Sequence, residues 1–191
     1  RQRQMCIRDS LLYNFNHILS DVVIGGFYQI LVVLGVHSVI VLPALMDVMA
    51  GTPSPNYASL GVVSFAVLGV TLGILCKTKS KKLKELALPA AVSALFGVTE
   101  PATYAIVMPR MKYLLVTCVS SAIACGVGGL FGFAVYTIPG FGIFKIPGYI
   151  DPANPVQSLI VASGVMLLAL AMGFIITYVM FNDAQYGDDK E

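Results

Sequence analysis

Charged residues are scarce in this sequence: Asp, Glu, Lys and Arg together make up 12% of the 191 residues, while 57% are hydrophobic. Soluble globular domains are about a quarter charged, so this composition excludes an ordinary water-soluble enzyme. It also excludes a disordered chain, because so much apolar surface does not stay in water. The net charge of +2 forms no basic stripe, so nucleic acid is not expected as a partner. The remaining class is an integral membrane protein, and we expect an all-α one.

Motifs that mark catalysis or metal binding are also absent. The four cysteines form no pair with CxxC or metal-ligand spacing. The sequence has no phosphate-binding Walker loop, no HExxH zinc motif and no dinucleotide-binding GxGxxG in front of a helix. We therefore predict no catalytic residue, no metal site and no cofactor. By itself the chain is expected to be inactive as an enzyme.

The two ends of the chain differ from its apolar middle. Residues 1–10 are polar, begin with Arg1 rather than methionine, and resemble the translated remnant of a sequencing adapter. We expect residues 1–10 to be a non-native extension in front of a truncated protein. Residues 182–191 are acidic and polar, as expected for a solvated cytoplasmic tail or a linker. The expected membrane domain is therefore residues 11–181.

Four apolar segments approach or exceed the roughly 20 residues that a helix needs to cross a bilayer. They are Val22–Val36, Ala58–Cys76, Tyr113–Tyr136 and Leu159–Phe181. His37–Ala50 contains Pro43 and is expected as a separate, broken element. Small residues at Ala124–Gly129 predict a close helix contact, and Pro139–Pro155 is expected as a loop on the outer side. The predicted fold has about four spanning helices plus one or two re-entrant hairpins.

One of these hairpins is predicted at Leu86–Pro109. Its first part, Leu86–Thr99, is uncharged but too short to cross the membrane. Basic residues flank the segment, at Lys77–Lys84 on one side and at Arg110 and Lys112 on the other. Basic loops favour the cytoplasmic side. Both basic clusters lie on that side if the segment between them enters the membrane and returns.

Glu100 would lie at the tip of this hairpin. A carboxylate at membrane depth costs about 2.5–3.5 kcal/mol or more, and such a residue is a functional candidate by default. Gly97 suits the end of one helix and Pro101 the start of the next, so the sequence predicts a helix, a break and a helix around a cavity. An interhelical salt bridge is the structural alternative for Glu100. Thr99 is expected either to offer its hydroxyl to the cavity or to cap the second helix.

His37 is the second candidate. A lone histidine among apolar residues is commonly a satisfied interior side chain, but a neutral imidazole beside Glu100 would both donate to and accept from the hydroxyls of a polyol. Asp47 is a weaker candidate, because it is also placed to face the outer water. Four aromatic side chains are placed to stack on a sugar ring, although core packing explains them as well: Phe27, Tyr28, Phe96 and Tyr104.

The string Gly97-Val-Thr-Glu-Pro101 resembles the GITE/GVTEP signature of enzyme IIC, the membrane component of sugar phosphotransferase systems, in the glucose superfamily. The longer strings at residues 83–104 and 26–37 are similar to the β-glucoside/sucrose branch. The similarity covers about residues 21–181. It implies the C-terminal, transport-domain half of the enzyme IIC fold. The sequence departs from the family pattern at residues 103–105 and at Ser38. These departures bear on which sugar is bound and not on the family.

The resemblance implies that Glu100 and His37, with Thr99 beside them, bind the hydroxyls of a β-glucoside or sucrose-like sugar. It implies a phosphoenolpyruvate-dependent, sugar-translocating subunit that crosses the bacterial cytoplasmic (inner) membrane several times. The implied partners are the sugar, the lipid bilayer, IIB and IIA domains that are fused or separate, and a second copy in a full-length homodimer. In that family the IIB domain is phosphorylated on a cysteine, and the loop that carries this cysteine is not in this sequence.

Two other classes compete with this interpretation. In an ion-coupled secondary transporter, Glu100 and His37 would relay protons rather than hold a sugar. In a purely structural membrane subunit, neither residue would bind a ligand. Sugar uptake that depends on phosphoenolpyruvate, rather than on a proton gradient, distinguishes the first interpretation from the second.

Overall fold

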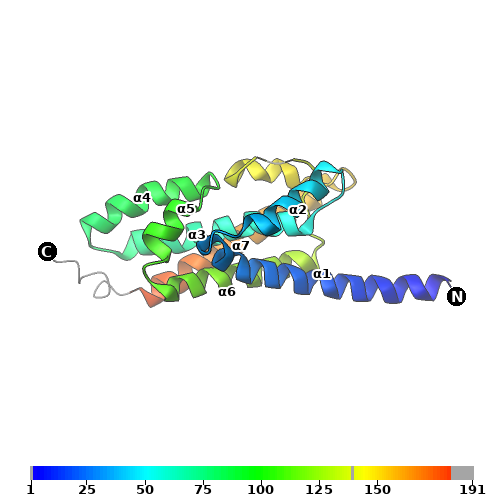
Figure 1. Ribbon diagram of the computed structural model, residues 1–191, viewed down its shortest axis with the longest axis horizontal. Coiled ribbons are helices and arrows are strands. Elements are labelled where there is room, and N and C mark those ends of the chain that lie inside the picture. The colour runs from blue at the N-terminus through cyan, green and yellow to red at the C-terminus, as the bar shows by residue number, and fades with distance from the viewer. Residues whose placement is uncertain (1, 139, 182–191) are drawn as a thin grey trace.

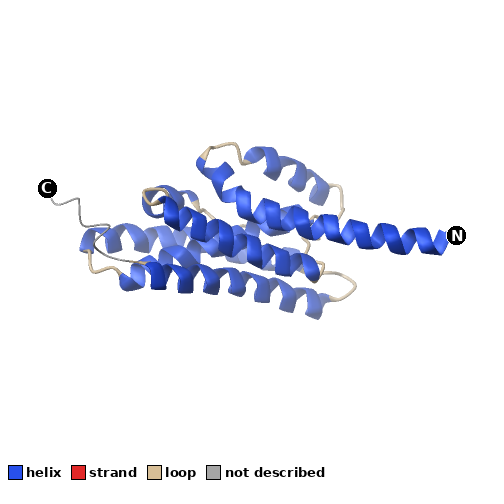
Figure 2. Ribbon diagram, turned by 90° about the horizontal axis from the view of Figure 1, so that it is seen from below, coloured by secondary structure: helices blue, strands red, loops and turns tan. Residues whose placement is uncertain are grey.

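A computed structural model describes residues 2–138 and 140–181, with side chains from residue 18 onward. The tail expected at 182–191 lies outside the described residues. Within those ranges the chain consists of helices and loops, and its β-type pairing is one isolated bridge between Ser54 and Val135. The prediction of an all-α protein is confirmed. Figures 1 and 2 show the helices as an elongated bundle from which the first part of α1 extends at one end.

The described elements follow one another in this order: α1 (Gln2–Val33), α2 (Ser38–Met49), α3 (Pro55–Lys77), α4 (Lys81–Leu95), α5 (Glu100–Ala102), the π-helix η1 (Thr103–Val107), α6 (Met111–Leu130), the 3₁₀ helix η2 (Gly142–Tyr149) and α7 (Pro155–Met180). In the described part of the chain α3, α6 and α7 are long and apolar enough to cross a membrane. The span expected at Val22–Val36 corresponds to the shorter apolar stretch Ile18–Val33, in a helix that continues back to Gln2. Helix α6 ends at Leu130, earlier than the expected Tyr136, because the chain turns through Gly132 at φ +68°.

Helix α3 is the centre of the bundle. Its side chains are buried along almost its whole length, and α1, α2, α4, α6 and α7 all pack against it. The contact with α7 is close, because a Cβ atom on Gly73 would lie 3.0 Å from the carbonyl oxygen of Phe174. A Cβ atom on Gly173 would likewise lie 2.7 Å from the carbonyl oxygen of Ala66. Small residues thus let these two backbones meet without intervening side chains.

Helices α1 and α6 make the second close contact. The Ser121 hydroxyl donates a 2.6 Å hydrogen bond to the carbonyl oxygen of Gly25. Gly126 and Gly129 face α1, where added Cβ atoms would lie 2.8 Å from Val22 and 3.0 Å from Asp21. The close helix contact predicted from the small residues 124–129 is confirmed.

The hairpin formed by α4, α5 and η1 connects α3 to α6, and it starts and finishes at the same end of the bundle. At that end, the Lys77 ammonium donates a 2.7 Å hydrogen bond to the Tyr178 carbonyl oxygen near the end of α7. The ring of Tyr113, near the start of α6, stacks on the ring of Phe181 with 6.2 Å between centroids. Figure 1 shows α4 starting there and α5 and η1 leading back. The predicted helix, break and helix are confirmed, and the two basic clusters lie at the same end of the bundle.

Candidate functional site

One cavity, of about 180 Å³, brings the three predicted site residues together. His37 reaches it from the segment between α1 and α2, whereas Thr99 and Glu100 reach it from the break in the hairpin. The cavity is lined by these residues together with Tyr28, Val32, Val41, Tyr57, Leu60, Gly61, Val63, Ser64, Gly97, Phe141, Gly142 and Lys145. The wall therefore combines apolar side chains with several hydrogen-bonding groups. This is the usual composition of a small-molecule site.

Glu100 is held at the cavity by the break in the hairpin. Gly97 adopts φ +89° and ends α4, and Pro101 lies in the first turn of α5. Within the described residues the Glu100 carboxylate makes no ion pair, so the salt-bridge alternative is not found. Thr99 is the residue before α5, but its hydroxyl makes no capping hydrogen bond. The carboxylate and the hydroxyl next to it are thus both available to a ligand.

His37 is placed by the end of α1. Gly35, at φ +74°, turns the chain out of the helix, and the Val36 amide donates a 3.0 Å hydrogen bond back to the Leu31 carbonyl oxygen. The His37 ring meets the Tyr28 ring edge-on, with 6.2 Å between centroids and 81° between the planes. Its Nδ1 atom is buried and has no hydrogen-bond partner in the described structure. A buried polar atom without a partner at a cavity is a position that a ligand can satisfy.

Two hydrogen bonds join the segments that carry His37 and Glu100. The buried Gln29 amide on α1 donates to the Thr103 hydroxyl on η1 at 2.6 Å. The Tyr104 hydroxyl donates to the Val32 carbonyl oxygen at 3.1 Å. Because these bonds link the end of α1 to the returning arm of the hairpin, they fix the separation of the two predicted ligand residues.

The other candidates lie mainly outside the cavity. Asp47 is exposed and does not line it. Of the four aromatic side chains, only Tyr28 lines the cavity. Phe27 is 62% exposed, Phe96 stacks on Phe144 with 6.0 Å between centroids, and Tyr104 bonds to the backbone of α1.

Sequence analysis missed Lys145. It placed residues 139–155 in an outer loop, but η2 folds back so that Phe141, Gly142 and Lys145 line the cavity. Lys145 is 6% exposed, and burial lowers its pKa to about 7. The signal in the sequence was one lysine in a stretch of Gly, Pro and aromatic residues that is otherwise uncharged from 139 to 150.

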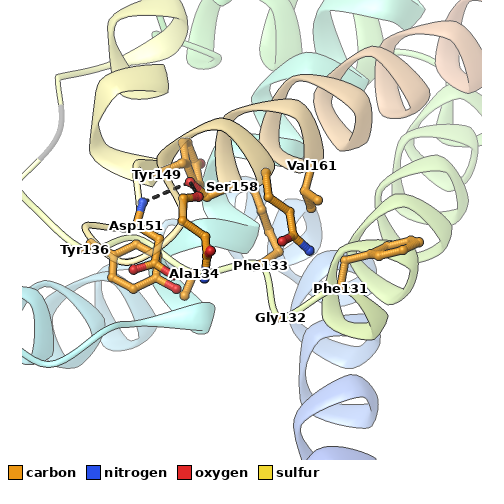
Figure 3. A pocket seen from close by; sticks show the side chains of 11 residues that line it. Phe131, Gly132, Phe133, Ala134, Tyr136, Tyr149, Asp151, Ser158 and Val161 are labelled. Atoms are coloured by element: carbon orange, nitrogen blue, oxygen red, sulfur yellow. Dashed lines mark hydrogen bonds between the residues drawn. The ribbon is translucent and has the colours of Figure 1, made fainter.

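A second cavity, of about 120 Å³, lies where α6 ends and α7 begins (Figure 3). Two of its polar side chains are engaged in local hydrogen bonds: the Asp151 amide donates to the Ser158 hydroxyl at 2.9 Å, and the Ala153 amide donates to the Asp151 carboxylate at 2.9 Å. His37, Thr99 and Glu100 are not among the residues that line it. The first cavity is therefore the candidate site.

Comparison with known proteins gives one family. The sequence model of the family described as "Phosphotransferase system, EIIC" matches residues 4–122. The chain belongs to this enzyme IIC family. The match confirms the resemblance found in the sequence and, with the three long apolar helices, shows that this enzyme IIC chain is a membrane protein.

The relatives of this enzyme IIC chain are sugar-specific components. It is 33% identical to the "PTS system beta-glucoside-specific EIIBCA component" of Halalkalibacterium halodurans over 75% of the chain and 22% of the relative. It is 32% identical to the "PTS system arbutin-, cellobiose-, and salicin-specific EIIBC component" of Escherichia coli over 85% of the chain and 34% of the relative. A sucrose-specific EIIBCA component of Pediococcus pentosaceus is 30% identical over 94% of the chain and 27% of the relative. The chain thus spans between a fifth and about a third of the length of these relatives. No solved structure matches it.

Proposed function

We propose that this chain is the sugar-binding part of an enzyme IIC that carries a β-glucoside or sucrose-like sugar across the bacterial inner membrane. The bound sugar is then presented to a IIB domain for phosphorylation. The observation that carries this proposal is the convergence of Glu100, His37 and Thr99 on one cavity. The names of the related β-glucoside and sucrose components support the choice of sugar class.

The chemistry of the cavity suits a neutral polyol. The Glu100 carboxylate accepts hydrogen bonds from hydroxyl groups, the Thr99 hydroxyl donates and accepts, and the imidazole of His37 does both when neutral. The apolar and aromatic side chains of the wall cover the C–H faces of a sugar ring. The volume of about 180 Å³ equals the liquid volume of about six water molecules, which one sugar ring would replace.

We infer the partners and the orientation from the relatives and from the charges. The relatives are EIIBC and EIIBCA components, so IIB and IIA domains are the proposed phosphoryl donors, and a full-length homodimer in the lipid bilayer is the proposed assembly. Residues 11–181 are the proposed membrane domain, and the end with both basic clusters is the proposed cytoplasmic end. Exposed apolar side chains on α2 and α7 fit lipid or the rest of the membrane domain as their cover.

Uptake by membrane vesicles tests this function. The full-length protein is expressed with its IIB and IIA domains, and radiolabelled salicin, cellobiose and sucrose are offered to vesicles that contain phosphoenolpyruvate and the soluble carrier proteins that pass its phosphoryl group to IIA. We expect phosphorylated sugar to accumulate for at least one of the three, and only with phosphoenolpyruvate. Accumulation of unmodified sugar, driven by a proton gradient alone, would show that Glu100 and His37 serve an ion-coupled transporter instead.

A further inference from the structure

Lys145 brings a buried positive charge to the cavity. Its ammonium donates a 2.8 Å hydrogen bond to the Tyr57 carbonyl oxygen and lies 4.1 Å from the centroid of the Tyr57 ring. Of its three N–H groups, the carbonyl takes one, and the ring attracts the charge without needing a second directed bond. Donors therefore remain for the cavity that this side chain lines.

The position of Lys145 is fixed from two sides. At the start of η2, the backbone of Gly142 (φ +55°) lies in contact with the backbone of residues 95–97 at the hairpin break. At the end of η2, the Tyr149 hydroxyl donates a 3.0 Å hydrogen bond to the Ala58 carbonyl oxygen on α3. Gly61 leaves room for this docking, because a Cβ atom there would lie 3.1 Å from Cδ of Lys145. The ammonium is thus placed before any ligand arrives, which lowers the ordering cost of binding.

A buried charge without a partner is expensive for the fold. In the described part of the chain, Lys145 forms no ion pair with a carboxylate, and the Tyr57 contacts only partly replace the water it has lost. Glu100 lines the same cavity, also without an ion pair. A sugar hydroxyl can connect these two charges, since it donates to a carboxylate while its oxygen accepts from an ammonium.

We propose that Lys145 is a third sugar ligand, which donates a hydrogen bond to the oxygen of a hydroxyl group on the sugar that Glu100 and His37 bind. This inference rests on the proposed function. It adds η2 to the two segments that carry His37 and Glu100 as a source of sugar ligands. This element lies more than 40 residues further along the chain than Glu100. The sugar then closes a bridge between the hairpin break, the end of α1 and η2.

Equilibrium binding of radiolabelled salicin to vesicles with the full-length protein, without phosphoenolpyruvate, tests the proposal. Lys145→Met keeps an unbranched side chain, one atom shorter, and removes the donor, and we expect it to weaken binding about ten-fold or more. Tyr149→Phe removes one hydrogen bond from η2 to the backbone of α3 but leaves the ammonium, so it measures the part of the loss that comes from docking of η2, and it should weaken binding less than Lys145→Met does. Lys81→Met, on the exposed first turn of α4, controls for net charge. Lys81→Met should bind within about two-fold of the unmodified protein.

A series of monodeoxy glucosides separates a ligand from a structural residue. For the unmodified protein, the analogue without the hydroxyl that Lys145 contacts should bind about ten-fold more weakly than the parent sugar. In Lys145→Met the difference between that analogue and the parent sugar should be clearly smaller, because the bond from Lys145 is already lost. If every analogue loses the same factor in both proteins, the side chain is not a ligand.

The outcomes distinguish this inference from the proposed function. Weakening by Glu100→Gln with normal binding by Lys145→Met overturns the role of Lys145 alone. Equal weakening by Lys145→Met and Tyr149→Phe shows that docking of η2, not the ammonium, matters, and also overturns it. Normal binding by both Glu100→Gln and Lys145→Met overturns the proposed function of the cavity itself.

Discussion

At the scale of single residues, the cavity combines groups whose hydrogen-bonding capacity is unused. Glu100 makes no ion pair within the described residues, Thr99 makes no capping bond, and Nδ1 of His37 is buried without a partner. Native structures rarely leave buried polar atoms unpaired, and the exceptions need an explanation. A polyol that fills the cavity supplies one for Nδ1 of His37, and the same ligand can bond to Glu100, which is exposed, and to Thr99, which is half-buried.

The pH dependence of sugar binding should report the charge of Lys145. Burial lowers the pKa of this side chain to about 7, so the empty cavity holds an ammonium below pH 7 and an amine above it. If the ammonium is the form that binds, the contribution of Lys145 to sugar affinity is constant below pH 7. It decreases as the pH rises from 7 to 9. Salicin affinity measured at half-unit steps from pH 6 to pH 9 checks this.

The control for that experiment is Lys145→Met. The other titratable side chains on the cavity are His37, Glu100, Tyr28 and Tyr57, and the variant keeps them all. Its affinity should therefore lack the decrease above pH 7. Parallel decreases in both proteins would assign the titration to those other groups and contradict the prediction.

At the scale of elements, the break between α4 and α5 positions the site. Gly97 has φ +89°, where a side chain is strained, and an added Cβ would meet the backbone of Gly142. Gly97→Ala should therefore push η2 away from the hairpin and disturb Glu100 and Lys145 together. We expect the detergent-solubilised full-length protein to lose about 1–2 kcal/mol of stability or more, and to lose salicin binding.

Gly164→Ala is the matched control for Gly97→Ala. Gly164 lies on α7 with ordinary helical geometry, and no atom lies within 4 Å of the position of its added Cβ. Its thermal unfolding midpoint should equal or slightly exceed that of the unmodified protein, since alanine is the better helix former. Equal midpoints and equal binding for both variants would mean that the hairpin break does not depend on Gly97.

The hairpin could be predicted from sequence because its causes are local. Gly97 and Pro101 end and start helices wherever they occur, and a charge such as Glu100 in an apolar stretch indicates a functional site. The return of η2 could not be predicted in this way. Its position depends on contacts with Gly97 and Gly61, which are more than 40 and 80 residues away in the chain, and no local pattern at Lys145 encodes them.

The ends of the helices also have either local or long-range causes. Helix α3 begins at Pro55, ahead of the expected Ala58, since Ser54 accepts a 3.3 Å hydrogen bond from the Tyr57 amide and Pro55 follows it. Apolar composition alone misplaced the end of α6, because residues 133–135 are buried although they are not helical. Val135 is instead held by reciprocal backbone bonds of 3.0 and 3.1 Å with Ser54. In this loop, residues are therefore buried without being helical.

At the scale of the whole molecule, the common end of the two basic clusters makes a prediction about topology. In a cysteine-free, full-length background, cysteines placed at Lys79 and Lys112 should react with an impermeant maleimide only from the cytoplasmic side. A cysteine placed at Thr137, in the exposed loop after α6, should react only from the outside. Labelling of the Lys79 and Lys112 positions from opposite sides would mean that α4, α5 and η1 together cross the membrane.

The central claim is that Glu100 and His37 bind one sugar in one cavity, and binding of salicin to the full-length protein tests it most directly. Glu100→Gln removes hydrogen bonds to a charged acceptor, each worth about 1.5–3 kcal/mol, so affinity should fall about ten- to a hundred-fold. His37→Ala should weaken binding less, and the double variant should lose less than the sum of the two effects. Glu85→Gln, on the exposed face of α4, should bind normally. Unchanged affinity in Glu100→Gln, with the Glu85→Gln control also unchanged, would contradict the account.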